Sequence, residues 1–385
     1  MQDAITGALA LSAYADALGL RNEKRGLKGE VSPFYDGPLP MTNTFRDSDA
    51  NPWNIWAPLD TTRGLRGVVS DDTAVRAVLI EPWLASLPHT AAVSETSFER
   101  WLSDDRTPEQ VSWREAMAAE QARQWLQMFR LVVSRTDPEA EDLPPKFYVH
   151  DAPLIYGVFL YHEIALAFAG RPSQEVFSVF SEICRLDAGP AAGVTGVMAV
   201  LAADAAATDP AVGVDQWAGA AVDSSLALWS EADEFPGDNQ RPPVRDCYFE
   251  LGVASRHLDP ESFLSNLKSQ WHDPSPEYDE DKGLKHYDAV LQLGQTLACL
   301  GYGGDDWLLA LRVAASISGD TDTVATHLGL LIGAKQGWGA LRESAVAPEL
   351  VTVAETTEQL FGRSLDERVQ AIASYHPRLW PGTLA

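Results

Sequence analysis

The sequence is poor in cysteine and in positive charge. Its 3 cysteines, Cys184, Cys247 and Cys299, are too few and too far apart for a disulfide framework or a thiolate metal site. We therefore expect a reducing compartment, the cytoplasm. The 29 basic residues stand against 55 acidic ones, and the net charge of -26 excludes a general affinity for nucleic acid or anionic membranes. A phosphate-bearing ligand would need a bound cation or helix N-termini.

Long apolar runs and strand patterns are also absent. No uninterrupted run of about 20 apolar residues occurs, so we predict no membrane span. Residues 4–20 are mildly apolar, but Asp3 stands where a signal peptide has a basic residue, and we expect a first helix of the mature protein. No alternating run is bounded by hairpin turns. The sequence predicts an all-α protein with one large core, a single domain over residues 1–385.

Several common catalytic motifs are missing. Residues 301–304, Gly-Tyr-Gly-Gly, lack the spacing of a dinucleotide fingerprint, and we expect them to join two helices. There is no Walker A sequence and no serine nucleophile elbow. His162-Glu163 lacks the second histidine of a zinc protease, so His162 is interpreted as an ordinary helix residue. His150 and Asp151 precede Ala152-Pro153 at a loop-to-helix junction, where they serve either as a cap or as a ligand contact.

Two short acidic segments precede helical patterns far apart in the chain. Residues 70–73 read Ser-Asp-Asp-Thr, and residues 320–323 read Asp-Thr-Asp-Thr. Aspartate and threonine at a helix start are most often caps for backbone N–H groups. Because the arrangement occurs twice, the two helix starts can instead face one another across a pocket and hold divalent cations.

The first helix contributes a further acid. Asp16 continues the three-and-four spacing of Ile5 and Leu9, which places it on the face to be buried. Asp16 either bonds to nearby backbone groups at the helix end or belongs to a site. We expect the helix to end at Gly19, and Glu23 follows shortly after.

These acids suggest a pair of metal ions. Five carboxylates brought together would repel one another strongly unless two divalent cations lay among them. Carboxylate, hydroxyl and water oxygens suit Mg²⁺ or Mn²⁺ rather than zinc, and such a pair would polarise an oxygen or activate water. The five acids are Glu23, Asp71, Asp72, Asp320 and Asp322.

Residues 31–66 form the longest segment without a helical pattern. The segment holds 5 prolines, many small polar residues, and Trp53 and Trp56. Long loops in compact domains are often functional, so we predict an ordered lid or insertion loop. Packing of the tryptophans against the body is the alternative.

Three segments together resemble the ADP-ribosylglycohydrolase family. Residues 7–10 and 15–19, Gly-Ala-Leu-Ala and Ala-Asp-Ala-Leu-Gly, are similar to the family's opening G-A-L-x-G and G-D-A-L-G, and Glu23 falls at an acidic metal-site position. Residues 70–73 resemble its T-D-D-T, and residues 319–325, Gly-Asp-Thr-Asp-Thr-Val-Ala, match its G-D-T-D-T-V-A. Their order and spacing agree across almost the whole chain.

The resemblance implies an orthogonal multi-helix fold with two Mg²⁺ ions in a cleft. In the family's pattern, Asp71 and Asp322 take part in catalysis, and Glu23 gates the site or positions water. The family's middle motifs are replaced around His150 and Asp151, which are the predicted substrate-binding residues. The metal ligands that the resemblance implies are Ser70, Asp71, Asp72, Asp320, Asp322 and Thr323.

The predicted function is Mg²⁺-dependent hydrolysis of the bond between ADP-ribose and an acceptor. The acceptor is a protein side chain or a small conjugate. Two alternatives stay open: a divergent member that acts on another N- or O-ribosylated small molecule, and a catalytically silent ADP-ribose-binding protein.

Overall fold

The computed structural model describes residues 1–20, 22, 33–40, 64–70, 72–74, 76–77, 162–183, 190–229, 243–271, 289–317 and 320–375. These residues are mostly helical and contain no strand apart from a single bridge residue at Arg66, which confirms the all-α fold class. None of the helices in these ranges is long and apolar enough to cross a membrane. The elements are α1 (Gln2–Gly19), η3 (Leu166–Phe168), α7 (Ser173–Ile183), α8 (Pro190–Ala207), α9 (Val214–Leu226), α11 (Val244–Asp246), η4 (Cys247–Gly252), η5 (Val253–Ser255), α12 (Pro260–Gln270), α13 (Ala289–Gly303), α14 (Trp307–Ala314), α15 (Thr321–Arg342), α16 (Ala347–Phe361) and α17 (Leu365–Ser374).

Local signals in the sequence set many helix ends. The side chain of Asp259 caps α12 by accepting from the Ser262 N–H, and Ser364 and Glu367 form a reciprocal capping box at the start of α17. Helix α1 ends at Gly19, as predicted. Residues 301–304 close α13 and lead into α14, which confirms their predicted role as a connection.

Residues 247–255 are helical but do not form an α-helix. Here the chain forms the π-helical η4 and then the 3₁₀ helix η5. The backbones of η4 and α13 approach closely at Gly252, where a Cβ would lie 2.9 Å from the Cα of Gly301. Helical periodicity in a sequence does not distinguish these variants from an α-helix, because a π-turn adds only one residue to the pattern.

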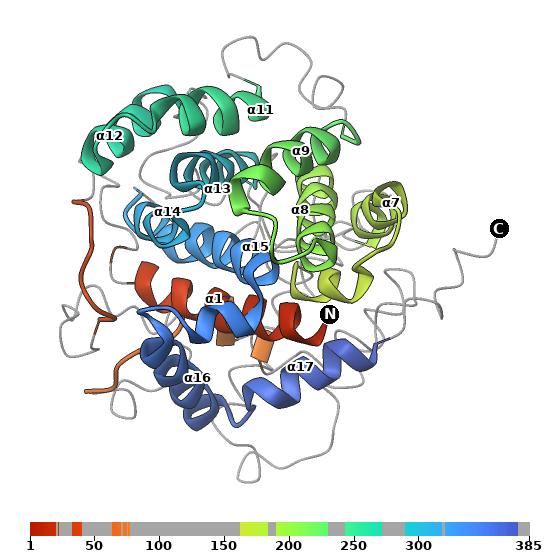
Figure 1. Ribbon diagram of the computed structural model, residues 1–385, viewed down its shortest axis with the longest axis vertical. Helices are drawn as coiled ribbons and strands as arrows, with labels where there is room; N and C mark the ends of the chain where they lie inside the picture. Colours follow the sequence, from red (N-terminus) through yellow and green to blue (C-terminus); the bar gives the residue numbers. More distant parts are fainter. Residues whose placement is uncertain are drawn as a thin grey trace, which may run out of the picture.

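Helices α1 and α15 pack side by side at the centre of the molecule (Figure 1). Both are apolar on almost every side, as expected for helices enclosed by others. A Cβ on Gly333 would overlap the carbonyl oxygen of Gly7, so the two backbones touch where neither residue has a side chain. At Gly329 the lack of a side chain likewise lets the α15 backbone approach the Leu11 carbonyl of α1.

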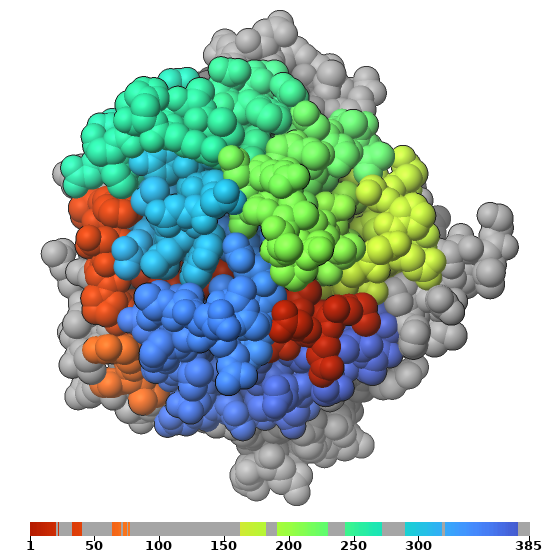
Figure 2. Space-filling view, viewed as in Figure 1, coloured from red at the N-terminus to blue at the C-terminus, as the bar shows by residue number. Residues whose placement is uncertain are grey.

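The other helices cover this central pair. Helices α16 and α17 pack against α1, and α8, α13 and α14 pack against α15. Figure 2 shows the N-terminal end of α1 at the surface between neighbouring helices, and the residues from Ile5 onward that carry hydrophobic side chains are buried. Helix α15 continues to Arg342, because Gly337 takes a φ of 73° and lets a second helical segment follow a kink.

Part of the predicted lid lies in the described residues. The backbone N–H of Tyr35 donates to the hydroxyl of Ser316 at 3.0 Å, and Leu39 is buried. Residues 33–40 therefore pack against the body beside the end of α14. Trp53 and Trp56 lie outside the described residues, and the single-domain organisation with a lid stays a prediction.

We predict that Gly333→Ala destabilises the protein by about 2–3 kcal/mol, because the added methyl meets backbone that no side-chain rotation can move. Urea unfolding followed by circular dichroism measures the change. Gly219→Ala in α9 is the matched control, since its Cβ would lie 3.9 Å from the nearest atom. The control should be neutral or stabilising by roughly 0.5–1 kcal/mol. Equal unfolding midpoints for the two variants would contradict the role given to the close helix contact.

Candidate functional site

The start of α15 presents carboxylates that do not cap the helix. Asp320 occupies the N-cap position, but its side chain makes no capping hydrogen bond. One of its oxygens instead accepts from the Thr323 hydroxyl at 2.9 Å, and the other accepts from the Gln292 side-chain amide on α13. The ordinary capping interpretation therefore fails for Asp320, and its carboxylate belongs to a polar site.

Asp16 holds the second acidic segment in place. It is fully buried near the end of α1, and its two oxygens accept from the backbone N–H groups of Ser70 at 2.9 Å and Thr73 at 3.0 Å. The backbone groups that Asp16 binds are thus not neighbours in sequence but belong to a segment more than 50 residues away. Asp16 caps, from another helix, the helical turn that starts at Asp72.

The two acidic segments meet at Thr323. Its hydroxyl oxygen lies 2.8 Å from Asp72 Oδ2 and 2.9 Å from Asp320 Oδ1. Ser70 Oγ lies 3.5 Å from Asp72 Oδ2 and accepts from the Asp72 N–H at 3.2 Å. A hydroxyl has one proton and donates to one acceptor at a time, so the Thr323 hydroxyl donates to only one of the two carboxyl groups.

Two hydrogen bonds fix the end of α1 to the start of α15, and Asn22, just beyond α1, to the C-cap residue of α14. The Thr321 hydroxyl donates to the Gly19 carbonyl at 2.9 Å, and the Asn22 side-chain amide donates to the Ala315 carbonyl at 2.7 Å. A Cβ on Gly19 would lie 2.7 Å from the Cα of Asp322, so glycine is needed for this approach. The helix contact that organises the fold thereby also sets the position of the acids.

The acids are buried with little positive charge among them. Burial and then the neighbouring Asp322 raise the pKa of Asp16 to about 6, against the hydrogen bonds from Thr73 and Ser70. Burial raises the pKa of Asp72 well above its usual range, with Asp322 and Asp16 adding to the rise, and burial likewise raises the pKa of Asp322. Asp72 Oδ1 is buried without a hydrogen-bond partner. The cluster has unused acceptor capacity and an excess of negative charge.

Two histidines pack together within the core. The rings of His162 and His327 lie 5.2 Å apart in an edge-to-face arrangement. Burial, and then the positive charge of Arg76, lower the pKa of His162 to about 3, and burial also lowers the pKa of His327 well below its usual range. Both rings are neutral at pH 7 and therefore add no positive charge near the acids.

The described part of the chain places five of the predicted site residues in one region: Ser70, Asp72, Asp320, Asp322 and Thr323. Within that part, no three His, Cys, Asp or Glu side chains form a group that would hold a metal by themselves. The remaining predicted site residues, Glu23, Asp71, His150 and Asp151, lie outside the described residues.

Gln292 was not predicted as a site residue. It lies on α13 among Leu291, Leu293 and other buried apolar residues, and it is itself fully buried. A long polar side chain on an otherwise apolar helix face is the sequence feature that would have identified Gln292 as a candidate.

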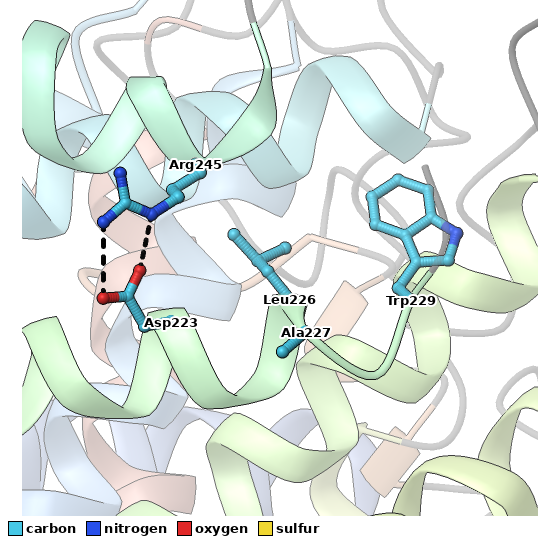
Figure 3. A pocket seen from close by; sticks show the side chains of 5 residues that line it. All are labelled: Asp223, Leu226, Ala227, Trp229 and Arg245. Carbon is cyan, nitrogen blue, oxygen red and sulfur yellow. Dashed lines mark hydrogen bonds and ion pairs between the residues drawn. The ribbon is translucent and has the colours of Figure 1, made fainter. Parts of the chain in front are cut away.

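A separate pocket lies between α9 and α11. It has a volume of about 410 Å³ and is lined by Leu226, Ala227, Trp229 and the ion pair Asp223–Arg245, whose Oδ1–Nε distance is 2.7 Å (Figure 3). It shares no residue with the acidic cluster. Among these lining residues Asp223 is the only one with a carboxylate, and it already pairs with Arg245. The acidic cluster is therefore the stronger candidate for catalysis.

Comparison with known proteins supports the family resemblance that the three sequence motifs indicate. A model of the ADP-ribosylglycohydrolase family matches residues 1–371. The chain belongs to this family of glycosidase-type hydrolases, which cleave ADP-ribosyl bonds. No curated protein matches the sequence. A solved structure titled ADP-ribosylglycohydrolase-related protein complex aligns with 94% of this chain and 98% of that chain, at 19% identity and a TM-score of 0.48.

We predict that the buried neutral state of His162 makes the protein less stable in acid. The unfolded chain takes up the proton near pH 6.5, whereas the folded protein does so only near pH 3, so stability falls as the pH drops below 6.5. Between pH 7 and pH 5 this group costs about 2 kcal/mol.

Urea unfolding of wild type and His162→Gln at both pH values tests this. The stability of wild type relative to the variant should fall by about 2 kcal/mol from pH 7 to pH 5. His257→Gln, at the protein surface, controls for the loss of a histidine. Parallel pH curves for wild type and His162→Gln would contradict the burial argument.

Proposed function

We propose that this protein hydrolyses the bond between the anomeric carbon of an ADP-ribosyl group and its acceptor, and that it depends on two Mg²⁺ ions. Mn²⁺ is the expected substitute. The observation that carries the proposal is the meeting of two acidic segments at Thr323, whose hydroxyl contacts Asp72 and Asp320. Asp72 and Thr323 are 251 residues apart in the chain.

The residues present fit a divalent cation bound by oxygen. The donors are carboxylates and hydroxyls, which Mg²⁺ and Mn²⁺ prefer over the nitrogen and sulfur ligands that zinc usually takes. Asp72 Oδ1 is buried with no hydrogen-bond partner, and burial raises the pKa values of Asp72 and Asp322, with like charge adding to the rise at Asp72. The proposed ligands are Ser70, Asp71, Asp72, Asp320, Asp322 and Thr323, of which Asp71 lies outside the described residues.

Bound cations would hold ribose hydroxyl oxygens, offset the negative charge of a pyrophosphate and lower the pKa of a water molecule. The carboxylates of the chain have a separate task. Departure of the acceptor leaves positive charge on the anomeric carbon, and Asp322 is proposed to stabilise that charge. Glu23 is proposed to position the attacking water. His150 and Asp151 are proposed to contact the substrate away from the metal centre.

Interactions around the acids keep them in position. Asp16 fixes the segment that carries Ser70 and Asp72 through two backbone N–H groups, and Gln292 orients the Asp320 carboxylate. Such outer partners set the geometry of metal ligands and tune their basicity. The acids are therefore arranged before any substrate arrives, which supports a catalytic rather than a purely structural role.

Incubation with Mg²⁺ and peptides ADP-ribosylated on arginine or on serine tests the proposal. Release of free ADP-ribose is the expected result. Release of ribose from conjugates that lack the adenylate would indicate a general ribosidase. A rise in melting temperature with ADP-ribose, without cleavage of any substrate, would indicate a binding protein and overturn the proposed hydrolysis.

We predict that Asp322→Ala and Asp71→Ala each lower the rate at least about 100-fold and weaken Mg²⁺ binding, because each removes a proposed ligand. The helical circular dichroism spectrum should stay unchanged. Glu355→Ala removes an exposed carboxylate from α16 and should keep full activity. Full activity in both site variants would refute the site.

We predict that Gln292→Leu weakens Mg²⁺ affinity roughly 10–100-fold, since Asp320 loses the amide that orients it. Isothermal titration with Mg²⁺ measures the effect. Gln270→Leu, at the exposed end of α12, is the matched control for the same change of side chain. Unchanged affinity in Gln292→Leu would remove Gln292 from the site.

A further inference from the structure

Glu163 links two arginines from distant parts of the chain. Its Oε1 atom lies 2.8 Å from Arg368 Nη2 on α17 and 3.4 Å from Arg76 Nε. The side chains are only 1% to 2% exposed. Glu163 belongs to the helical residues just before η3, which packs against α17. Three separate elements are therefore joined through one carboxylate oxygen.

Arg76 connects this cluster to the candidate site. It lies one helical turn after Asp72, in the helical residues that also include Thr73. Residues four apart on a helix share a face, so the position of Arg76 restrains the position of Asp72. The positive charge of Arg76 also opposes the rise in the pKa of Asp72. The helical turn is thus held at one end by Asp16 and at the other by Glu163.

The cluster is poorly built for stability alone. Three charges are buried, and Glu163 Oε2 together with the Nε, Nη1 and Nη2 atoms of Arg76 has no hydrogen-bond partner. Burying charges costs more than an imperfect pair returns, and apolar residues of similar volume often stabilise a protein as well or better. The neighbouring histidines are neutral and add no further positive charge to it. Such a cluster is better suited to fixing one arrangement of the chain.

We propose that Glu163 is a positioning residue that, through Arg76, fixes the helical turn carrying Asp72 and Thr73, and that Arg368 makes the C-terminal helix α17 part of this support. The consequence for catalysis rests on the proposed function, because it requires that Asp72 binds a metal ion. The structural link between α17 and this turn does not depend on that function.

Two variants separate positioning from electrostatics. Arg368→Met removes a positive charge, whereas Glu163→Gln removes a negative charge. If the cluster acted only through its charge, the first would strengthen Mg²⁺ binding and the second would weaken it. If the cluster positions the turn, both variants weaken Mg²⁺ affinity about 10-fold, as loss of an outer support does in metal sites. Arg368→Lys keeps the charge and should show a smaller loss of the same sign.

Amide hydrogen exchange of the metal-free protein tests the link without reference to metal. The N–H groups of Ser70, Thr73 and Ala74 are hydrogen-bonded and should be protected. We expect exchange in residues 70–77 to become about 10-fold faster in Arg368→Met and to accelerate less in Arg368→Lys, with exchange in residues 324–336 of α15 as the internal reference. Arg245→Met, which breaks the exposed pair with Asp223, is the control for losing an ion pair.

The possible outcomes are distinct. Faster exchange in residues 70–77, together with weaker Mg²⁺ binding in both charge variants, supports the proposal. Opposite changes in Mg²⁺ affinity, or equal acceleration in both segments, would overturn it. A wild-type protein that binds no Mg²⁺ would refute the proposed function, and exchange would then still decide whether Arg368 supports the turn.

Discussion

The close contact between α1 and α15 is the constraint on which the rest of the structure depends. Glycines at Gly7, Gly329 and Gly333 let the two backbones touch, and Gly19 continues the contact to the start of α15. Dispersion between closely packed atoms is weak for each pair but large in sum, and it is lost when backbones separate. The same contact brings Asp16 and Asp322 together, so core packing and site geometry have one cause.

The candidate site is costly for the fold. Several carboxylates are buried close together, and burial raises their pKa values, with repulsion from neighbouring carboxylates adding to the rise at Asp16 and Asp72. Natural proteins keep such unfavourable arrangements mainly where function requires them. The surrounding hydrogen bonds from Ser70, Thr73 and Gln292 offset part of the cost and leave acceptor capacity at Asp72.

The sequence was enough to predict the fold class, the family, the end of the first helix at Gly19, and the meeting of the two acidic segments, which is seen between Asp72 and Thr323. Periodicity identifies which helix face is buried, and repeated acidic motifs identify candidate ligands. The sequence pattern does not show which polar groups from different helices contact one another. The bonds from Asp16 to a distant backbone, the amide of Gln292 and the cluster around Glu163 depend on tertiary contacts between residues 28 to 205 positions apart. The π-helix η4 does not follow from the sequence, because helical periodicity does not distinguish it from an α-helix.

The pairing of α1 with α15 has a consequence for synthesis on the ribosome. The Thr321 hydroxyl and the Gly19 carbonyl that it binds are separated by 302 residues. At a synthesis rate of 5–20 residues per second, the start of α15 is synthesised roughly 15–60 s after the end of α1. Throughout that interval the apolar side chains of α1 are not covered by α15. Contacts between residues this distant in sequence also form slowly. The nascent chain is therefore expected to need shielding by a chaperone until the last quarter of the protein has emerged.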